Sequence, residues 1–256
     1  VDNGASFFDA ISESLEWLIS LFTNALLWLN PMAFITIVVA IALYFRRSVG
    51  LAVYAVVALS LIWNLGYWVE TMQTLALVLY AALFCMVIGL PIGIYAAHHP
   101  TFYKALQPVL DLMQTVPTFV YLIPTLTLFG LGVVPGLIST IIFAIAAPIR
   151  LTYLGISEVP QDILEAGRSF GATKRQLLFR IELPAAASSI AAGVTQCIML
   201  SLSMVVIAAL VGADGLGKPV VRALNTVDIA SGFEAGLAIV LLAILLDRLF
   251  KAGQAK

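Results

Sequence analysis

Residues 164–184 read LEAGRSFGATKRQLLFRIELP, and they differ sharply from the sequence on either side. The stretch is rich in charged side chains, whereas the flanking runs are apolar and carry few charges. Pro160 suits a helix start, Gly171 ends that helix, and Thr173 has the residue type and position of a cap for the next one. The pattern predicts short helices joined by a turn, forming a compact knob between two apolar segments.

The knob also carries apolar residues, including Phe170, on its surface. A solvated connector between two apolar segments is one interpretation. A connector, however, needs neither ordered helices nor exposed apolar side chains, because such patches mark interaction sites. The sequence therefore favours a docking surface for a partner protein.

The composition places the remainder of the chain in a membrane. Of the 256 residues, 62% are hydrophobic and 11% are charged, with a mean hydropathy of +1.06. Soluble domains carry about 25% charged residues, so this chain has too little polar surface for a water-soluble globule. Apolar segments of helix-spanning length recur, which predicts an all-α integral membrane protein.

Other classes of site find no support in the sequence. The net charge of −1, without a basic run interleaved with aromatics, gives no reason to expect a nucleic-acid partner. Cys85 and Cys197 lie inside apolar runs and have no metal-ligand spacing, so no metal site is expected.

The apolar pattern predicts about seven transmembrane helices and an N-terminal amphipathic helix. Residues 7–29 repeat apolar side chains at helical spacing, with acids on the opposite side, so we expect this helix to lie in the membrane interface; a true span is the alternative. The domain organisation expected is this helix in 1–30, two accessory spans in 31–69 and a core of further spans in 70–256. The spans are expected at 31–45, 49–65, 71–97, 105–131, 134–156, 184–211 and 233–250.

The fourth of these segments is irregular. Pro108, Pro117 and Pro124 interrupt it, so we expect two short helices joined by a bend, with breaks at Pro117 and Pro124. Irregular backbone at membrane depth is tolerated where it is buried in protein or lines a cavity.

The basic residues predict an orientation. With the first span ending inside at Arg46 and Arg47, eleven of the 13 Lys and Arg residues fall on the cytoplasmic side. The charged knob and the C-terminus are then cytoplasmic, and the N-terminus is periplasmic.

The knob carries a resemblance. Glu165-Ala166-Gly167, three residues, Gly171, nine residues and then Ile181-Glu182-Leu183-Pro184 match the EAA–x3–G–x9–I–x–LP loop of the membrane subunits of bacterial ABC importers. Gly167 departs mildly from the Ala that is frequent there. The resemblance implies a type I importer permease fold with a coupling loop at about 158–183. The residues that it implies for ATPase coupling are Glu165, Ala166, Gly167, Arg168, Phe170, Gly171, Leu183 and Pro184.

A second resemblance narrows the family. The stretches 111–132 and 195–217 resemble quaternary-amine uptake permeases, those for glycine betaine, choline and related solutes, and the similarity runs from about residue 70 to 250. This implies a permease of the bacterial inner membrane that pairs with a second copy of itself, two ATPase subunits and a periplasmic binding protein. The chain has no GxxxxGK[ST] motif. ATP and magnesium are therefore expected on the ATPase and no cofactor on this chain, which we expect not to be an enzyme.

Polar residues at membrane depth are the candidates for a translocation path. Hydrogen bonding between helices is the alternative for the hydroxyl and amide groups. Two aromatic rings among the candidates could offer cation–π faces to a quaternary ammonium, although packing is the commoner role. The candidates are Asp111, Gln114, Thr115, Pro117, Thr118, Phe119, Tyr121, Gln196, Ser201, Ser203 and Met204, with the first group expected to face the second.

An ion-coupled secondary transporter of small zwitterions is the main alternative function. Such a protein usually shows charged coupling residues at mid-membrane and an internal repeat. Here Asp111 is the one candidate acid, and no repeat is evident. His98 and His99 precede Pro100 with no acid near them in sequence, so they are expected to be loop residues.

Overall fold

The computed structural model describes residues 2–251, and it describes side chains from residue 8 onward. All regular structure in this part of the chain is helical. The helices before the bend are α1 (Asp2–Trp28), α2 (Pro31–Arg46), α3 (Val49–Asn64), α4 (Trp68–His98) and α5 (Pro100–Thr115). They are followed by α6 (Phe119–Phe129), α7 (Val133–Ala144), α8 (Ala146–Ser157), α9 (Gln161–Ser169), α10 (Lys174–Leu177), the π-helix η1 (Leu178–Glu182), α11 (Leu183–Ala185), α12 (Ala187–Ala209), α13 (Gly217–Thr226) and α14 (Ile229–Phe250).

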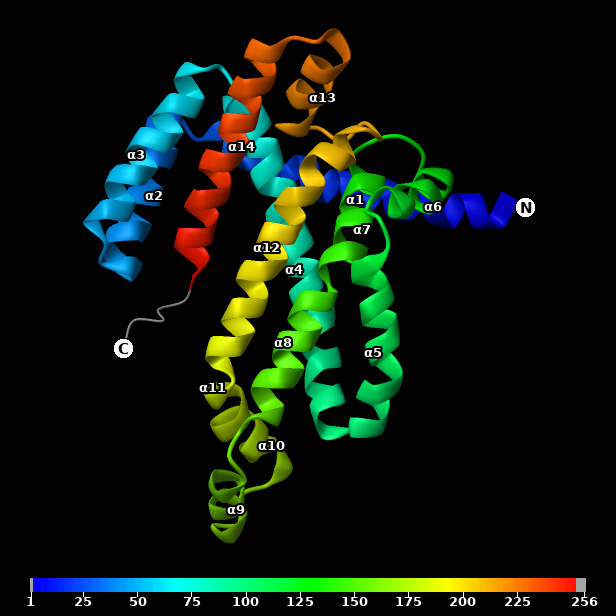
Figure 1. Ribbon diagram of the computed structural model, residues 1–256, viewed down its shortest axis with the longest axis vertical. Coiled ribbons are helices and arrows are strands. Elements are labelled where there is room, and N and C mark those ends of the chain that lie inside the picture. The colour runs from blue at the N-terminus through cyan, green and yellow to red at the C-terminus, as the bar shows by residue number, and fades with distance from the viewer. Residues whose placement is uncertain (1, 252–256) are drawn as a thin grey trace.

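The helices form an elongated bundle with the charged knob at one end (Figure 1). α4, α8 and α12 run side by side through its middle and pack against one another. α2, α3 and α14 lie on one flank, and α5 and α6 lie on the other. α9 and α10 project beyond the ends of the long helices.

Four segments of the described chain are long and apolar enough to cross a membrane: 68–98, 133–157, 187–209 and 229–250. Two bent pairs, α1 with α2 and α5 with α6, raise the number to six, and α3 is a shorter apolar helix of 16 residues. The predicted helical membrane class is confirmed. The seven predicted apolar segments all form helices, although length and composition alone support four to six spans.

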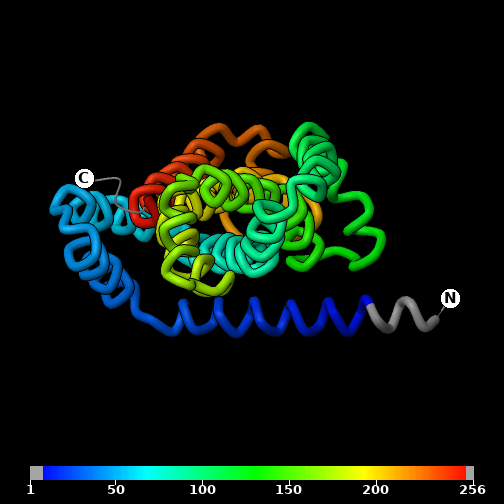
Figure 2. Tube along the Cα trace, turned by 90° about the horizontal axis from the view of Figure 1, so that it is seen from below, coloured from blue at the N-terminus to red at the C-terminus, as the bar shows by residue number. Residues whose placement is uncertain are grey.

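α1 is a long, straight helix that lies across the bundle (Figure 2). It meets α2 at 96°, and Asn30 caps the start of α2 by accepting a hydrogen bond from the amide of Met32 at 3.1 Å. The hydroxyl of Tyr80 on α4 donates to the carbonyl of Leu18 at 2.9 Å, which ties α1 to the bundle. The acids Asp9, Glu13 and Glu16 are exposed along α1.

The bend in the fourth predicted span lies at Pro117. α5 and α6 meet at 95°, and Val116 has the extended backbone that a following proline favours. Pro108 and Pro124 lie inside α5 and α6 without ending them. The predicted pair of short helices is confirmed, whereas the predicted second break at Pro124 is wrong, because a single proline inside an eleven-residue apolar helix leaves most of its other hydrogen bonds in place.

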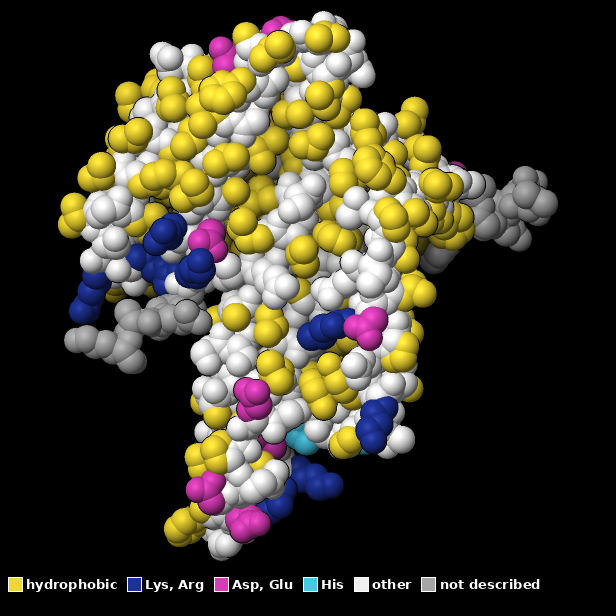
Figure 3. All heavy atoms as spheres, in the orientation of Figure 1, with side chains coloured by type: hydrophobic (Ala, Val, Ile, Leu, Met, Phe, Trp, Pro, Cys, Tyr) yellow, Lys and Arg dark blue, Asp and Glu magenta, His cyan; other side chains and the backbone are white. Residues whose placement is uncertain are grey.

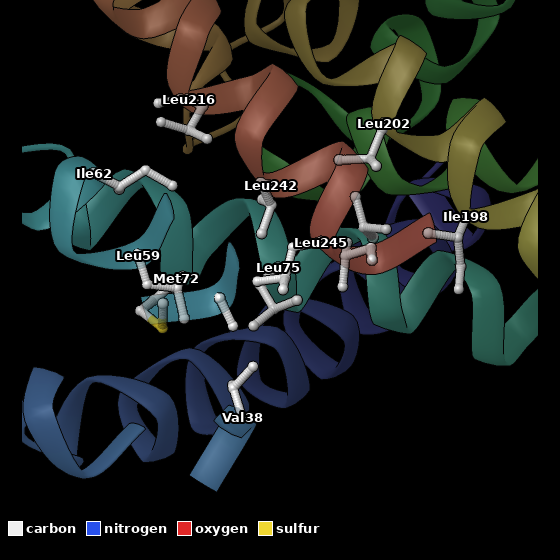
Figure 4. Close-up of a cluster of buried hydrophobic side chains, with 14 of the residues drawn as sticks. Val38, Leu59, Ile62, Met72, Leu75, Ile198, Leu202, Leu216, Leu242 and Leu245 are labelled. Carbon is white, nitrogen blue, oxygen red and sulfur yellow. The ribbon is translucent and has the colours of Figure 1, made fainter. Parts of the chain in front are cut away.

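The largest buried apolar cluster joins the flank of α2, α3 and α14 to the central helices (Figure 4). Leu59 on α3, Met72 on α4 and Leu242 on α14 are at most 2% exposed. Ile198 and Leu202 bring α12 into the same cluster. The segment predicted as an accessory part therefore shares its core with the predicted permease core.

Candidate functional site

The charged segment, residues 158–184, forms the knob at one end of the bundle. It contains α9, α10, η1 and α11 and lies between α8 and α12 (Figure 1). Leu164 on α9 and Leu177 on α10 are 7% and 6% exposed, and Val159 is 5% exposed. These three side chains are buried, and Leu177 lies close to Gly167 on α9, so the segment is packed rather than extended.

The turn at Gly171 is built by local hydrogen bonds. The amide of Gly171 donates to the carbonyl of Arg168 at 2.9 Å, and the amide of Ala172 donates to the carbonyl of Gly167 at 3.1 Å. Gly171 has φ = +78°, in the left-handed region that side chains other than glycine rarely adopt. The predicted glycine turn is present.

Thr173 caps the helix that follows the turn. Its hydroxyl accepts a hydrogen bond from the amide of Gln176 at 3.3 Å, and the side chain of Gln176 accepts one from the amide of Thr173 at 2.8 Å. This reciprocal pair is a capping box, which satisfies two amides that the helix start leaves unpaired. The predicted cap is confirmed.

Gly167 lets α9 approach η1 closely. A Cβ atom at this position would lie 2.7 Å from both Ile181 Cδ1 and Leu177 Cδ2. A side chain here would push these two residues away, so glycine in place of the family's frequent alanine is matched by large neighbours. α9 and η1 therefore form one packed unit.

The outer surface of the charged segment combines apolar and charged side chains. Phe170 at the tip is 94% exposed, and Ile163 and Phe179 are 46% and 58% exposed. Glu165, Ala166 and Arg168 are exposed beside them, and no ion pair of Glu165 is found among the side chains of residues 8–251. A folded knob that exposes a large aromatic at its tip has the character of a docking surface rather than of a solvated connector.

The segment ends in a widened helical turn that leads into α12. η1 is a π-helix, Leu183 is half-buried, and Pro184 is exposed at the start of α11. Glu182, the last residue of η1, is only 7% exposed, and its carboxylate lies 2.9 Å from Nε2 of His98 at the end of α4. Local sequence patterns do not pair these residues, because 84 positions separate them. The expectation that both histidines are loop residues is wrong for His98, which is the last residue of α4 and contacts an acid that lies far away in sequence.

The second candidate site is the face on which α5 and α12 flank α8 (Figure 1). α8 packs against both helices and lies between them in Figure 1. On α12, Gln196 and Ser203 are exposed together with Met199, at spacings that place them on one side of the helix.

Two predicted path residues on α12 lie elsewhere. Ser201 and Met204 are both 0% exposed within the chain. The hydroxyl of Ser201 donates to the carbonyl of Cys197 at 2.8 Å. The structure therefore packs both side chains in the helix bundle and does not bring them to this face.

Asp111 on α5 forms an ion pair with Arg150 on α8. Oδ1 of Asp111 lies 2.6 Å from Nη2 of Arg150. The side chains are 52% and 30% exposed, and Nε of Arg150 is buried without a hydrogen-bond partner among the described residues. Asp111 thus balances a neighbouring cation, which differs from the free mid-membrane acid that an ion-coupled transporter needs.

The bend beside Asp111 presents several of the remaining candidates. Gln114, Thr115 and Pro117 are exposed, and Thr118 is half-buried. Phe119 is 56% exposed. Tyr121, in contrast, uses its hydroxyl to donate to the carbonyl of Met113 at 2.8 Å across the bend, which stabilises the angle between α5 and α6.

Comparison with known proteins identifies the family. Residues 89–255 match the model of the binding-protein-dependent transport system inner membrane component. The chain belongs to this family. The permease is 47% identical to the glycine betaine/proline betaine transport system permease protein ProW of Escherichia coli, over 96% of this chain and 69% of that protein. It is 45% identical to the glycine betaine transport system permease protein OpuAB of Bacillus subtilis, over 95% of this chain and 86% of that protein.

A further relative and a solved structure agree with this assignment. The glycine betaine/carnitine transport permease protein GbuB of Listeria monocytogenes is 44% identical over 96% of this chain and 88% of that protein. The fold matches the MetNI methionine ABC transporter, solved in inward-facing conformations, with a TM-score of 0.63, 23% identity and coverage of 70% of this chain and 92% of that chain.

The family and the fold settle the general function. The chain is the inner-membrane permease subunit of an ATP-driven importer, and it has the type I importer permease fold. The predicted resemblance is confirmed. The ion-coupled secondary transporter, the alternative from sequence, is set aside by the family match and by the pairing of Asp111 with Arg150.

Proposed function

We propose that this permease imports small quaternary-amine solutes of the glycine betaine type. The observation that carries the proposal is the agreement among the relatives: three proteins 44–47% identical over at least 95% of the chain are all named for glycine betaine transport. Carnitine, proline betaine and trimethylamine N-oxide occur in the names of other relatives or in the same names. We therefore propose the substrate class and not an individual solute.

The working assembly that we propose contains two copies of the permease, two ATPase subunits and a periplasmic binding protein. ATP and magnesium bind to the ATPase, since the permease has no phosphate-binding motif. The domain division proposed is an N-terminal interfacial helix in 1–30, accessory helices in 31–69 and the permease core in 70–256.

The proposed orientation places the charged segment and the C-terminus in the cytoplasm and the N-terminus in the periplasm. It is supported by the distribution of basic side chains, which lie in the middle and lower parts of the face in Figure 3, with none visible in the upper part. Basic residues are enriched on the cytoplasmic side of membrane proteins.

The charged segment is proposed to dock on the ATPase and transmit its movement. Phe170, Glu165 and Arg168 form the contact, because they are exposed on a folded segment with buried leucines. Gly171 and Gly167 hold α9 in place against η1. A lever of this kind needs stiffness, and the capping box and the buried leucines supply it.

The translocation path is proposed along the face of α5, α8 and α12. Gln114, Thr115 and Thr118 lie at the bend in the α5–α6 pair, and Gln196 and Ser203 lie on α12. Phe119 offers an exposed ring to a quaternary ammonium. With Asp111 balanced by Arg150, this lining has no unpaired acid to hold the solute, which suits weak binding and rapid release.

Co-purification tests the proposed assembly. The permease is expressed with its own ATPase and binding protein, extracted in mild detergent and isolated through a tag on the ATPase. The wild-type chain should co-purify in a two-to-two complex, and Glu165→Lys should reduce the recovered permease while its level in the membrane is unchanged. Equal recovery of both permeases would contradict the docking role of the charged segment.

A further inference from the structure

α4 ends at His98, and the next residue, His99, makes the same local bond but has different neighbours. Nδ1 of His98 lies 2.8 Å from the carbonyl oxygen of Ile94, and Nδ1 of His99 lies 2.9 Å from that of Tyr95. Nε2 of His98 reaches the carboxylate of Glu182 in η1 at 2.9 Å. The ring of His99 instead stacks on Tyr95 of its own helix, with centroids 4.1 Å apart.

The contacts of His98 show where the protons lie between His98 and Glu182. A carbonyl oxygen only accepts, so Nδ1 of His98 carries a hydrogen. The contact between Nε2 and Glu182 then needs a second proton, either on the ring, giving an imidazolium beside a carboxylate, or on Glu182 itself. The two side chains are therefore joined through a shared proton.

The hydrogen bond between His98 and Glu182 lies in a partly buried place, which strengthens it. The side chain of Glu182 is 9% exposed, whereas that of His98 is 42% exposed. Hydrogen bonds with an ionised partner are stronger than neutral ones, and low exposure to water strengthens them further. Removing His98 would leave a buried carboxylate without this partner.

The position of Glu182 connects the charged segment to the long helices. It is the last residue of η1, and its neighbour Ile181 packs on α9 at Gly167. π-helical turns occur frequently at functional sites. A continuous chain of contacts thus runs from the exposed tip through α9 and η1 to Glu182, and across the shared proton to α4.

α4 is held firmly at this end. Gly93, five residues before His98, packs so closely on α8 that a Cβ atom there would lie 2.7 Å from Cβ of Thr152. A displacement of His98 is therefore passed to α8 as well as along α4. Because α8 carries Arg150, the ion pair with Asp111 on the proposed path lies on the same helix.

We propose that His98 and Glu182 are positioning residues that transmit the movement of the charged segment to α4. This rests on the proposed coupling function of that segment and adds a second connection to the one through α11 and α12. When the pair is lost, the ATPase still docks and hydrolyses ATP, but α4 follows the charged segment less completely.

The test measures ATP hydrolysed per solute transported, in the complete complex reconstituted into lipid vesicles with the binding protein and glycine betaine. His98→Leu and Glu182→Leu should each raise this ratio by about tenfold or more, the change in a conformational equilibrium for one charge-assisted hydrogen bond. Glu182→Gln should stay near the wild-type ratio, because its amide can donate to a neutral Nε2. His99→Leu is the matched control and should have no effect.

A structural role alone would lower the amount of complex or its melting temperature and leave the ratio unchanged. Wild-type ratios in His98→Leu and Glu182→Leu, or an equal rise in His99→Leu, would overturn the proposal. If Glu182→Leu does not assemble, His98→Leu decides, because its side chain is the more exposed of the pair. Glu165→Lys distinguishes a failure of this proposal from a failure of the proposed coupling function. If Glu165→Lys also transports normally, the coupling function of the charged segment is refuted. If Glu165→Lys loses transport while His98→Leu and Glu182→Leu keep the wild-type ratio, only the role of His98 and Glu182 is refuted.

Discussion

Replacing Gly171 by leucine tests whether the shape of the charged segment matters for transport. Gly171 has φ = +78°, and a Cβ atom there would meet nothing within 4 Å. The substitution therefore creates no clash, and its cost is the backbone cost alone. For a side chain such as leucine, the left-handed conformation costs about 1–2 kcal/mol.

That cost sets the size of the effect. A cost of 1–2 kcal/mol lowers the equilibrium ratio of a conformation to its alternatives by a factor of about 5–30. The turn, with its bonds from Gly171 to Arg168 and from Ala172 to Gly167, loses that factor against other conformations of the segment. Gly171→Leu should therefore reduce ATPase docking and initial uptake rates by up to that factor, while the long helices still insert.

The matched control is Gly171→Asn, because asparagine tolerates the left-handed region. Uptake of labelled glycine betaine into vesicles that contain the complete complex is compared for the two variants at equal permease content. The asparagine variant should retain most of the wild-type rate. Wild-type uptake by the leucine variant would refute the reasoning, and so would an equal loss in both variants, since backbone cost would not then explain it.

Three further predictions concern the path, the ion pair and the N-terminal helix. Thr118→Trp should block uptake without changing the affinity of the binding protein for the solute, and ATP hydrolysis should persist in part; normal uptake by the assembled variant would place the path elsewhere. Asp111→Asn should lower the stability of the permease by less than about 1 kcal/mol, because its ion pair with Arg150 is partly exposed. Uptake measured with and without ATP should still require ATP, and uptake that no longer requires ATP would contradict the structural role of this pair. Ala10→Cys, on the exposed side of α1, should react with a membrane-impermeant thiol reagent added from the periplasm, and labelling only after lysis would show that the helix has the opposite orientation.

The charged segment was largely predictable because its signals are local. Pro160, Gly171 and Thr173 act through their own backbone and their immediate neighbours, so the helix start, the turn and the cap were each predicted. The bend at Pro117 is local in the same sense.

The side of each long helix that faces protein was much harder to predict. Lipid and the protein interior are both apolar, so the pattern of an apolar span does not separate its buried face from its lipid face. Ser201 and Gln196 both lie on α12 as isolated polar residues, yet one is buried and the other exposed. Periodicity could not distinguish them.

The side-chain pairs between elements far apart in sequence could not be predicted either. His98 meets Glu182, and Asp111 meets Arg150, only after α4, α5, α8 and η1 have packed. A lone charge in a single sequence carries no record of its partner. π-helical geometry at η1 likewise depends on packing, and no residue in 178–182 indicates it in advance.

The account depends most directly on ATP-driven uptake of a betaine by a complex that contains this chain. Labelled glycine betaine is added outside vesicles that contain the permease, its ATPase and its binding protein, with ATP on the side of the ATPase. Uptake is measured with and without ionophores that dissipate ion gradients. We predict uptake that requires ATP and the binding protein and is unchanged by the ionophores. Uptake that continues without ATP and stops when the ion gradients are removed would contradict the account.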